Sequence, residues 1–141
     1  MKVIILKGIQ ASGKSTWAKA KIAEDPSFVR INKDEIRILL GTDGKPCGNE
    51  KMVCNYRDDF IKESLSNGLN VIVDDTNFNP FHEETIRNIA SAYSATVEIK
   101  WFKIPLKEAI ERDSKREGSA RIGKFAIINT YNKYKDIIEA N

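Results

Sequence analysis

The chain has 141 residues, of which 41% are hydrophobic and 30% are charged, and its formal net charge is +3 at pH 7. This composition is typical of one soluble globular domain with an ordinary hydrophobic core. No apolar run approaches the roughly 20 residues that cross a bilayer, which excludes a helical membrane protein.

An apolar strand followed by a glycine-rich loop opens the chain. Residues 3–6 are all branched and apolar, as expected of a strand that is buried on both faces of a parallel sheet. Residues 8–16 contain the pattern GxxxxGK[ST], and a helix-compatible stretch follows from Thr16 to Ala23. A strand, a glycine loop and a helix in this order predict a phosphate-binding site.

Strands and helices alternate along the rest of the chain. In chain order, the predicted elements after the first helix are strand 28–32, helix 33–40, loop 41–48, helix 49–65, strand 70–75, helix 80–93, strand 96–102, helix 106–116, basic loop 118–123 and helix 124–139. Such alternation predicts an α/β protein with the P-loop NTPase fold, in which a parallel sheet of about four strands has helices on both faces. We expect a single domain over residues 1–141, with a basic lid at about 112–124.

The glycine loop predicts a site for ATP and Mg²⁺. Its backbone N–H groups can converge on phosphate oxygens at a helix N-terminus, and Gly8 and Gly13 are expected to permit backbone angles that a side chain would block. Lys14 supplies a cation for the outer phosphates, and the Ser15 hydroxyl is the predicted Mg²⁺ ligand. The predicted nucleotide-binding residues of the loop are Gly8, Ala11, Ser12, Gly13, Lys14, Ser15 and Thr16.

Two acidic residues follow the third predicted strand, at the sheet edge where ligands of such folds bind. Asp75 can hold Mg²⁺ beside Ser15, directly or through water. Asp74 competes for this role, because neighbouring residues of a strand face opposite ways. Asp75 could instead cap the helix that begins at Pro80, since Asp is favoured at helix N-termini.

Asp34 is the candidate general base, because phosphoryl transfer to a hydroxyl needs a group that accepts its proton. It follows the second predicted strand, although a helix N-cap is an alternative role for it and Glu35 is an alternative base. Arg37 lies one helical turn further on, where a guanidinium fork suits a phosphate or carboxylate of the acceptor. An exposed surface charge is the alternative for Arg37.

Arginines near the end of the chain could close over the nucleotide. Arg112 and Arg116 are four residues apart and share a helix face, and Arg121 lies in the basic loop beyond them. On a mobile lid, these cations could stabilise the charge of the transition state. Alternatively, they form a solvated basic face that pairs with Glu108 and Glu117.

Four stretches of the chain together resemble the kinase domain of phage polynucleotide 5′-hydroxyl kinases, the type found in end-healing kinase-phosphatases. They are GIQASGKSTWA, INKDEIR, VIVDDTNFNP and FKIPLKEAIERDSKR, and the resemblance covers nearly the whole chain. GxxxxGKST alone would identify only a P-loop phosphotransferase, whereas its combination with NKDxxR and DTNxNP is much more specific. The resemblance implies ATP-dependent transfer of the γ-phosphate to the 5′-hydroxyl of DNA or RNA.

For the donor side, the resemblance implies that Lys14 and Ser15 contact the ATP phosphates and Mg²⁺. It favours Asp75 over Asp74 as the metal aspartate. It also implies that Arg112 lies by the nucleoside of ATP and that Arg116 reaches the phosphates from the lid as a catalytic residue.

For the acceptor side, the resemblance implies that Asp34 is the general base and that Arg37, with Thr76, holds the acceptor's 3′-phosphate. The chain departs from the phage enzyme at Asp74, where that enzyme has a small polar residue, and in the lid segment 118–123. These departures affect the choice of acceptor more than the chemistry. Because the chain stops at Asn141, we expect no 3′-phosphatase activity.

Other interpretations share the same donor site. A kinase of a sugar, nucleotide sugar, nucleoside or hydroxymethylated base differs only in its acceptor pocket, and a nucleotide-binding ATPase module would need neither Asp34 nor Arg37. We expect nucleic acid 5′ ends as the substrate, no membrane partner and a cytoplasmic location, which is the host cytoplasm for a phage protein. With one His in the chain, we expect no structural metal and free thiols at Cys47 and Cys54.

Overall fold

The computed structural model describes residues 1–44, 46 and 48–141. Within these residues, four parallel strands form one sheet in the order β2-β3-β1-β4. β1 pairs with β3 and β4, neither of which is the next strand in the sequence, and helices connect consecutive strands, as parallel pairing requires. The predicted α/β class with a parallel sheet of about four strands is confirmed. The strands are β1 (Lys2–Lys7), β2 (Phe28–Ile31), β3 (Asn70–Val73) and β4 (Thr96–Trp101).

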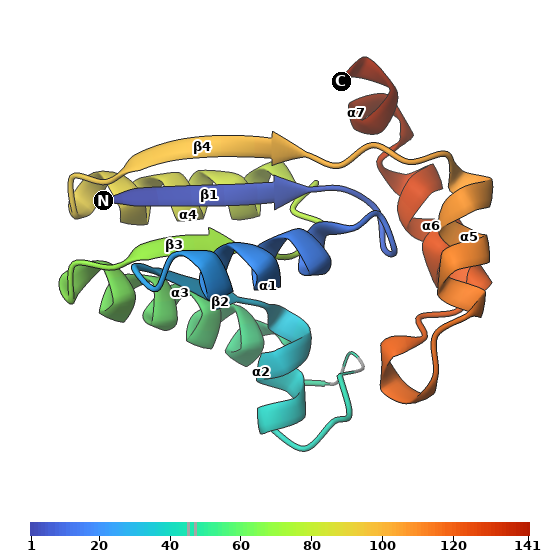
Figure 1. Ribbon diagram of the computed structural model, residues 1–141, viewed down its shortest axis with the longest axis horizontal. Coiled ribbons are helices and arrows are strands. Elements are labelled where there is room, and N and C mark those ends of the chain that lie inside the picture. The colour runs from blue at the N-terminus through green and yellow to red at the C-terminus, as the bar shows by residue number, and fades with distance from the viewer. Residues whose placement is uncertain (45, 47) are drawn as a thin grey trace.

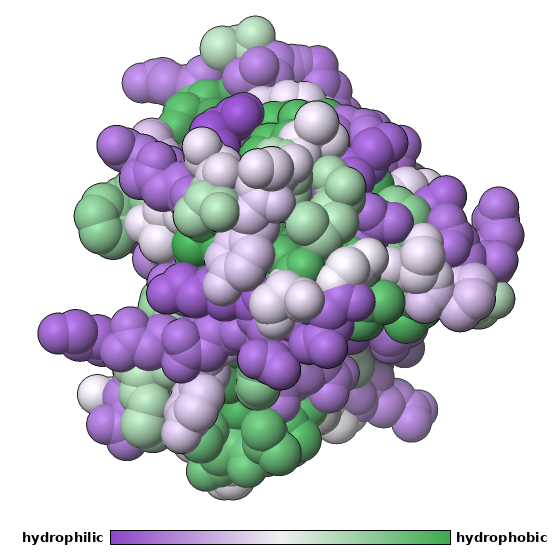
Figure 2. Space-filling model, turned by 90° about the vertical axis from the view of Figure 1, so that its left-hand side faces the viewer, coloured by the Kyte–Doolittle hydropathy of each residue, from purple (hydrophilic) through white to green (hydrophobic). Residues whose placement is uncertain are grey.

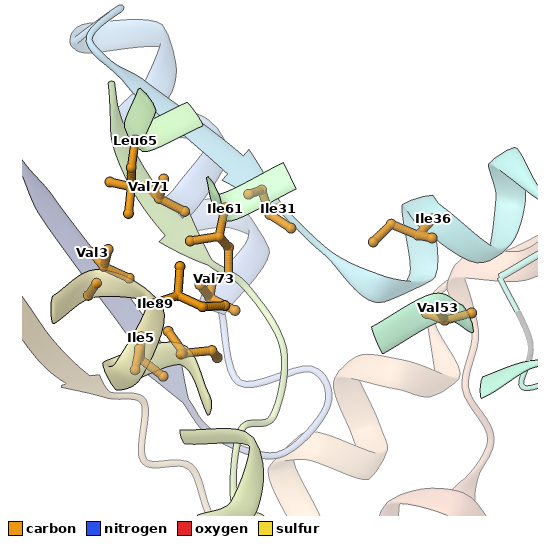
Figure 3. Packing of buried hydrophobic residues seen from close by; sticks show 12 residues of the cluster. Val3, Ile5, Ile31, Ile36, Val53, Ile61, Leu65, Val71, Val73 and Ile89 are labelled. Atoms are coloured by element: carbon orange, nitrogen blue, oxygen red, sulfur yellow. The ribbon is translucent and has the colours of Figure 1, made fainter. Parts of the chain in front are cut away.

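Helices cover both faces of this sheet, because successive residues of each strand point to opposite sides. On one face, Val3 and Ile5 pack with residues of α3 (Glu50–Ser66) and α4 (Pro80–Ala92), and Figure 3 shows this cluster. On the other face, Ile4 and Leu6 pack with Ala18 of α1 (Lys14–Glu24). Figure 1 shows α1 on one side of the sheet and α3 and α4 on the other.

A third apolar cluster lies beyond the carboxyl ends of the strands. There, α5 (Leu106–Ser114), α6 (Lys124–Lys133) and α7 (Lys135–Ala140) stack beside the sheet, at the right of Figure 1. Ala109, Ile127 and Phe78 are buried in this cluster together with Ile9 and Ala11 of the glycine loop. Burial of these side chains fixes the last third of the chain against the loop.

Several boundaries differ from those expected. Where one helix was predicted over 124–139, the helix is interrupted at Tyr134, which lies between α6 and α7 and whose ring centroid is 5.5 Å from that of Phe78. The helix predicted over 106–116 ends at Ser114, because the buried carboxylate of Asp113 accepts hydrogen bonds from the backbone that returns at residues 122–123. In α2 (Lys33–Leu39), Ile36 is buried as expected, whereas Leu39 is 74% exposed.

The remaining expectations concern membranes and thiols. Among the described residues, no helix is both long and apolar enough to cross a bilayer. Cys54 is a free thiol, as predicted, and Cys47 lies outside the described residues.

Hydrophilic and hydrophobic residues are interspersed at the amino ends of the strands (Figure 2), and the cavity described below lies at the opposite end of the sheet.

Candidate active site

A cavity of about 530 Å³ lies at the carboxyl ends of the strands and unites segments that are distant in sequence. It brings together all of the predicted site residues except Gly8, Arg112 and the lid residue Arg121. The phosphate loop forms one wall, the start of α2 and the end of β3 form the second, and α6 with the segment before it forms the third. The lining residues include Ala11, Ser12, Gly13, Lys14, Ser15, Thr16, Asp34, Arg37, Asp74, Asp75, Thr76, Arg116, Ile122 and Thr130.

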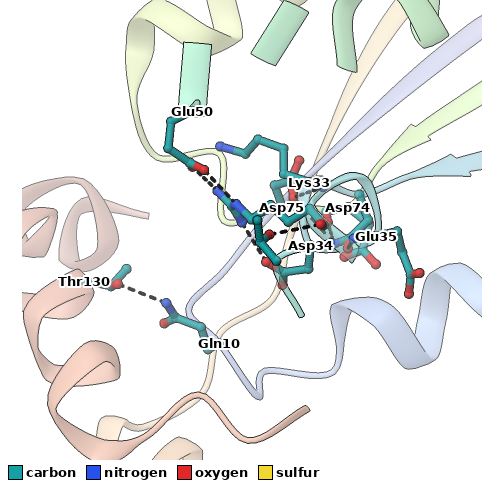
Figure 4. Close-up of polar contacts among 11 residues, drawn as sticks. Gln10, Lys33, Asp34, Glu35, Glu50, Asp74, Asp75 and Thr130 are labelled. Carbon is teal, nitrogen blue, oxygen red and sulfur yellow. Dashed lines mark hydrogen bonds and ion pairs between the residues drawn. The ribbon is translucent and has the colours of Figure 1, made fainter. Parts of the chain in front are cut away.

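The phosphate loop has the backbone shape that an anion requires. Ala11 and Gly13 both have left-handed backbone conformations, with φ of 63° and 99°. Alternation between left-handed and right-handed residues turns successive N–H groups toward one side, which creates a concave donor surface for phosphate oxygens. Gly13 immediately precedes α1, so the helix N-terminus adds its own unpaired donors. The α6 side chain of Thr130 accepts a 3.0 Å hydrogen bond from Gln10 (Figure 4), which ties this loop to the third wall.

The two loop glycines are needed for different reasons, and the expectation that both supply unusual angles is wrong for Gly8. Its φ is not positive, unlike that of Gly13. A Cβ placed on Gly8 would instead lie 2.7 Å from the backbone oxygen of Phe102 and 2.7 Å from Ser12 Oγ. Gly8 is therefore required by the close approach of the loop to the chain that follows β4.

Substituting Gly8 with alanine is expected to destabilise the protein. The contact with a backbone oxygen can be relieved only if the loop or the chain after β4 moves, and overpacking of this kind typically costs about 1–3 kcal/mol. Chemical denaturation followed by circular dichroism measures this loss. Gly48→Ala is the matched control, because a Cβ at Gly48 meets no atom within 4 Å; equal stability of the two variants would contradict the steric explanation.

Lys14 is folded back onto its own loop. Its Nζ donates to the backbone oxygens of Gly8 and Ile9, both at 2.9 Å, and to Ser12 Oγ at 3.4 Å. Burial lowers the pKa of Lys14 to about 8, although Asp74 and Asp75 act in the opposite direction. These hydrogen bonds hold the ammonium group next to the concave donor surface, within reach of an incoming phosphate.

Asp75 lies at the end of β3 with one oxygen paired and the other open. Its Oδ1 accepts a 3.0 Å hydrogen bond from the backbone N–H of Lys33, so this carboxylate joins β3 to the start of α2. Its Oδ2 is buried and has no hydrogen-bond partner among the described residues. Burial raises the pKa of Asp75 to about 6. The expected alternative, a cap on the helix that begins at Pro80, is wrong, because Asn79 caps that helix.

The donor set at this edge fits a nucleotide with its magnesium ion. Ser15 Oγ, Asp74 Oδ1 and Asp75 Oδ2 are hard oxygen ligands that line or border one cavity, and the two carboxylate oxygens are buried without hydrogen-bond partners in the described part of the chain. Mg²⁺ is typically held by one or two carboxylates together with substrate phosphates and water. When bound, the ion would neutralise charge on the outer phosphates.

Asp34 and Arg37 meet at the second wall of the cavity. Arg37 Nη1 donates to Asp34 Oδ1 at 2.7 Å, and its Nε and Nη2 both donate to the carboxylate of Glu50, the first residue of α3. Asp34, Asp74 and Asp75, all labelled in Figure 4, line the same cavity. The N-cap of α2 is Asn32, whose side chain accepts from the N–H of Glu35, so Asp34 is not the cap. Its side chain is half exposed to the cavity.

The predicted lid arginines separate into two environments. Arg116 lines the cavity and donates to the backbone oxygen of Ala120 at 3.4 Å. Arg112 lies outside the cavity lining and pairs with Glu108 at 2.7 Å across one helical turn, so its predicted position beside a nucleoside stays a prediction. The buried carboxylate of Asp113 accepts from the N–H groups of Ile122 and Gly123, both at 2.8 Å, and thereby folds the segment back toward α6.

Sequence reasoning missed three polar residues that organise the site. Arg30 pairs with Asp74 at 2.6 Å, Glu50 holds Arg37, and the Asn77 side-chain amide donates to backbone oxygens of Leu6 and Val73. Asn77 therefore fastens the ends of β1 and β3, and its φ of 53° fits one of the few residue types that adopt this conformation. Of these three residues, only Asn77 belongs to a recognisable motif, the DTN triplet at residues 75–77.

The sequence is similar to those of known proteins. A family model described as "AAA domain" matches residues 3–139. The chain is 34% identical over 142 residues to an L-seryl-tRNA(Sec) kinase of Methanococcus maripaludis, in a match that covers 94% of this chain and 52% of that protein. It is 26% identical over 148 residues to a bifunctional polynucleotide kinase/RNA ligase of Autographa californica nuclear polyhedrosis virus, covering 94% of this chain and 21% of that protein. The chain thus spans about half and about a fifth of these relatives.

Solved structures show the same fold. A chain of the Pnkp1/Rnl/Hen1 RNA repair complex is 28% identical with a TM-score of 0.80, over 99% of this chain and 46% of that chain. A chain in a second structure of the Pnkp1/Rnl/Hen1 complex gives a TM-score of 0.72 at 29% identity, over 79% and 38%. An APS kinase of Mycobacterium tuberculosis, at 17% identity and a TM-score of 0.55 over 81% and 69%, shares the fold.

Proposed function

The chain belongs to the AAA domain family, and from this premise we propose that it is an ATP-dependent kinase that transfers the γ-phosphate to the 5′-hydroxyl of a polynucleotide. One observation carries the proposal: a single cavity holds both the phosphate loop and the Asp34–Arg37 pair. The first is suited to a phosphate donor and the second to an acceptor with a hydroxyl and an anionic group. An ATPase module that transfers to no acceptor would need only the first.

On the donor side, the N–H groups of the phosphate loop and Lys14 bind the phosphates of ATP. Ser15 and Asp75 would hold the Mg²⁺ that accompanies the nucleotide, and the ion would neutralise charge at the outer phosphates. Arg116, the cavity-lining guanidinium of the third wall, adds positive charge beside the transferred group. These fixed charges stabilise the transition state without reorganisation of water.

On the acceptor side, Asp34 takes the proton of the attacking hydroxyl. The hydroxyl oxygen forms a bond to the γ-phosphorus, the bond between that phosphorus and the bridging oxygen of ATP breaks, and ADP leaves with the electron pair. Arg37 binds the phosphate 3′ of the attacked sugar, with Thr76 beside it, and so places the 5′-hydroxyl within reach of Asp34. The side chains of this scheme all line the same cavity.

The relatives support a hydroxyl carried by a nucleic acid and favour two candidates. The viral kinase/ligase and the RNA repair complex favour a polynucleotide 5′ end. The relative named as an L-seryl-tRNA(Sec) kinase favours a second candidate, the primary hydroxyl of a seryl group carried on a tRNA, because it is 34% identical over nearly the whole chain. A primary alcohol attached to RNA is common to both.

Radiolabelled γ-phosphate separates these candidates. Purified protein is incubated with labelled ATP and, in parallel, 5′-hydroxyl DNA, 5′-hydroxyl RNA, seryl-tRNA, nucleosides and sugars. Label on the oligonucleotide 5′ ends supports the proposal, and label on seryl-tRNA alone supports the second candidate. ATP hydrolysis with label on no acceptor would contradict both candidates and favour an ATPase module.

Arg37 provides the sharpest test of the acceptor. Arg37→Ala should raise KM for an oligonucleotide about ten- to a hundredfold, because a charge-assisted hydrogen bond is worth about 1.5–3 kcal/mol. KM for ATP should stay almost unchanged, since Arg37 lies on the acceptor wall of the cavity. Wild-type protein should prefer a nucleoside 3′-monophosphate over the nucleoside, and Arg37→Ala should remove that preference.

Lysine at the same position is the matched control. Arg37→Lys keeps the positive charge but lacks the planar fork that now pairs with Glu50 through two nitrogens, so it should rescue only partly. Equal use of the nucleoside and its 3′-phosphate by wild-type protein would instead favour a small-molecule kinase.

A further inference from the structure

Asp74 is a buried carboxylate that the proposed reaction does not use. Its side chain is 1% exposed, it lines the cavity, and its Oδ1 is buried with no hydrogen-bond partner among the described residues. Burial lowers the pKa of Lys14, and the charge of Asp74 acts in the opposite direction, as do those of Asp75 and Asp34. An open carboxylate oxygen therefore lies next to the phosphate loop, in addition to that of Asp75.

Arg30, at the sheet-edge strand β2, is the residue that compensates this charge. Its Nε donates to Asp74 Oδ2 at 2.6 Å, and its Nη2 donates to Ser15 Oγ at 3.4 Å. Its Nη1 lies 3.9 Å from a carboxylate oxygen of Glu35, and its side chain is only 11% exposed. One guanidinium thus joins the end of β3, the first turn of α1 and the first turn of α2.

We propose that Arg30 is a positioning residue whose positive charge balances the metal pocket, by which we mean the oxygen ligands of Ser15, Asp74 and Asp75. It holds Asp74 with Oδ1 open toward the cavity, and it keeps the pocket from binding a divalent cation until nucleotide phosphates are present. The inference rests on the proposed function in one respect, the assignment of Ser15 as a ligand of the nucleotide's Mg²⁺.

The physical reason is the balance of charge in the pocket. A buried carboxylate needs a counter-charge, and the guanidinium of Arg30 supplies it for Asp74. A second nitrogen of the same guanidinium donates to the Ser15 hydroxyl. For a divalent cation that arrives alone, the charges of Arg30 and Lys14 offset those of Asp74 and Asp75, so the pocket offers it little net attraction. The phosphates of ATP add several negative charges, which shift this balance toward binding of the ion.

Binding of Mn²⁺ in the absence of nucleotide tests the proposal, with Mn²⁺ as the probe because its free form is counted by electron paramagnetic resonance. Wild-type protein should bind Mn²⁺ weakly. Arg30→Gln should bind it on the order of tenfold more tightly, because the buried Asp74 then lacks its counter-charge. Arg87→Gln is the matched control, since Arg87 pairs with Glu83 at 2.9 Å outside the cavity and its loss should change nothing.

Two further variants keep the test decisive. The double substitution Arg30→Gln/Asp74→Asn removes both charges of the pair and should return Mn²⁺ binding to the wild-type level. Arg30→Lys, for use if Arg30→Gln does not fold, retains a charge but cannot span Asp74 and Ser15, and should give an intermediate gain. Thermal unfolding of each variant without metal establishes that it is folded.

Three results would overturn the proposal: tight Mn²⁺ binding by wild-type protein, unchanged binding by the folded Arg30 variants, or a double variant that still binds tightly. The outcome is separable from the proposed function. If Arg30→Gln gains Mn²⁺ binding but wild-type protein transfers phosphate to no acceptor, the role of Arg30 is retained and the kinase proposal is rejected. If wild-type protein transfers phosphate but Arg30→Gln gains no Mn²⁺ binding, the kinase proposal is retained and the role of Arg30 is rejected.

Discussion

Replacing Lys14 with alanine is expected to lower phosphate transfer by about a hundred- to a thousandfold, the usual effect of removing one electrostatic donor from a transition state. The fold should persist. Burial lowers the pKa of Lys14 to about 8, which means that folding already disfavours its charge. Single-turnover transfer and thermal unfolding measure the two effects separately.

The same pKa gives Lys14 a signature in the pH profile. Only the protonated ammonium pairs with a phosphate, so kcat/KM for ATP, which reports the free enzyme, should fall as pH rises through about 8. Lys19→Ala, on the exposed face of the same helix, is the matched control and should leave both rate and profile unchanged. Near-normal transfer by Lys14→Ala would show that the glycine loop is not the donor site.

Asparagine at position 34 is expected to lower turnover by about a hundred- to ten-thousandfold while ATP binding persists. The substitution keeps the size of the side chain and an oxygen that can accept from Arg37, but it removes the carboxylate that takes the proton of the acceptor. Pre-steady-state transfer to an oligonucleotide, together with a separate measurement of ATP affinity, distinguishes a loss in the chemical step from a loss in binding.

Glu35→Gln is the matched control for Asp34, because it removes the neighbouring negative charge. Asp34 lines the cavity. Glu35 does not, and the side chain of Glu35 is 60% exposed. We therefore expect Glu35→Gln to stay active. An active Asp34→Asn beside an inactive Glu35→Gln would reassign the general base.

The sequence by itself determined the fold class and the two ends of the proposed reaction. Apolar runs of residues 3–6 and 70–73 can be buried on both faces only in a parallel sheet with helices, and the carboxyl ends of such strands share one edge. The glycine loop after the first strand, Asp34 after the second and Asp75 after the third therefore had to meet. Local spacing was sufficient for these residues because each follows directly from a strand end.

The tertiary structure alone decided which charges pair and which remain open. Arg30 and Asp74 are 44 residues apart, and Arg37 and Glu50 are joined through a loop, so no local pattern reveals either pair. Gly8 reads as a turn residue in the motif, yet its constraint comes from the backbone of Phe102 on a different strand connection. Arg112 and Arg116 share a predicted helix face, but α5 ends between them at Ser114 and only Arg116 reaches the cavity. Long-range ion pairs and close contacts depend on the relative placement of whole elements, and that placement is fixed by packing of the core rather than by any single segment.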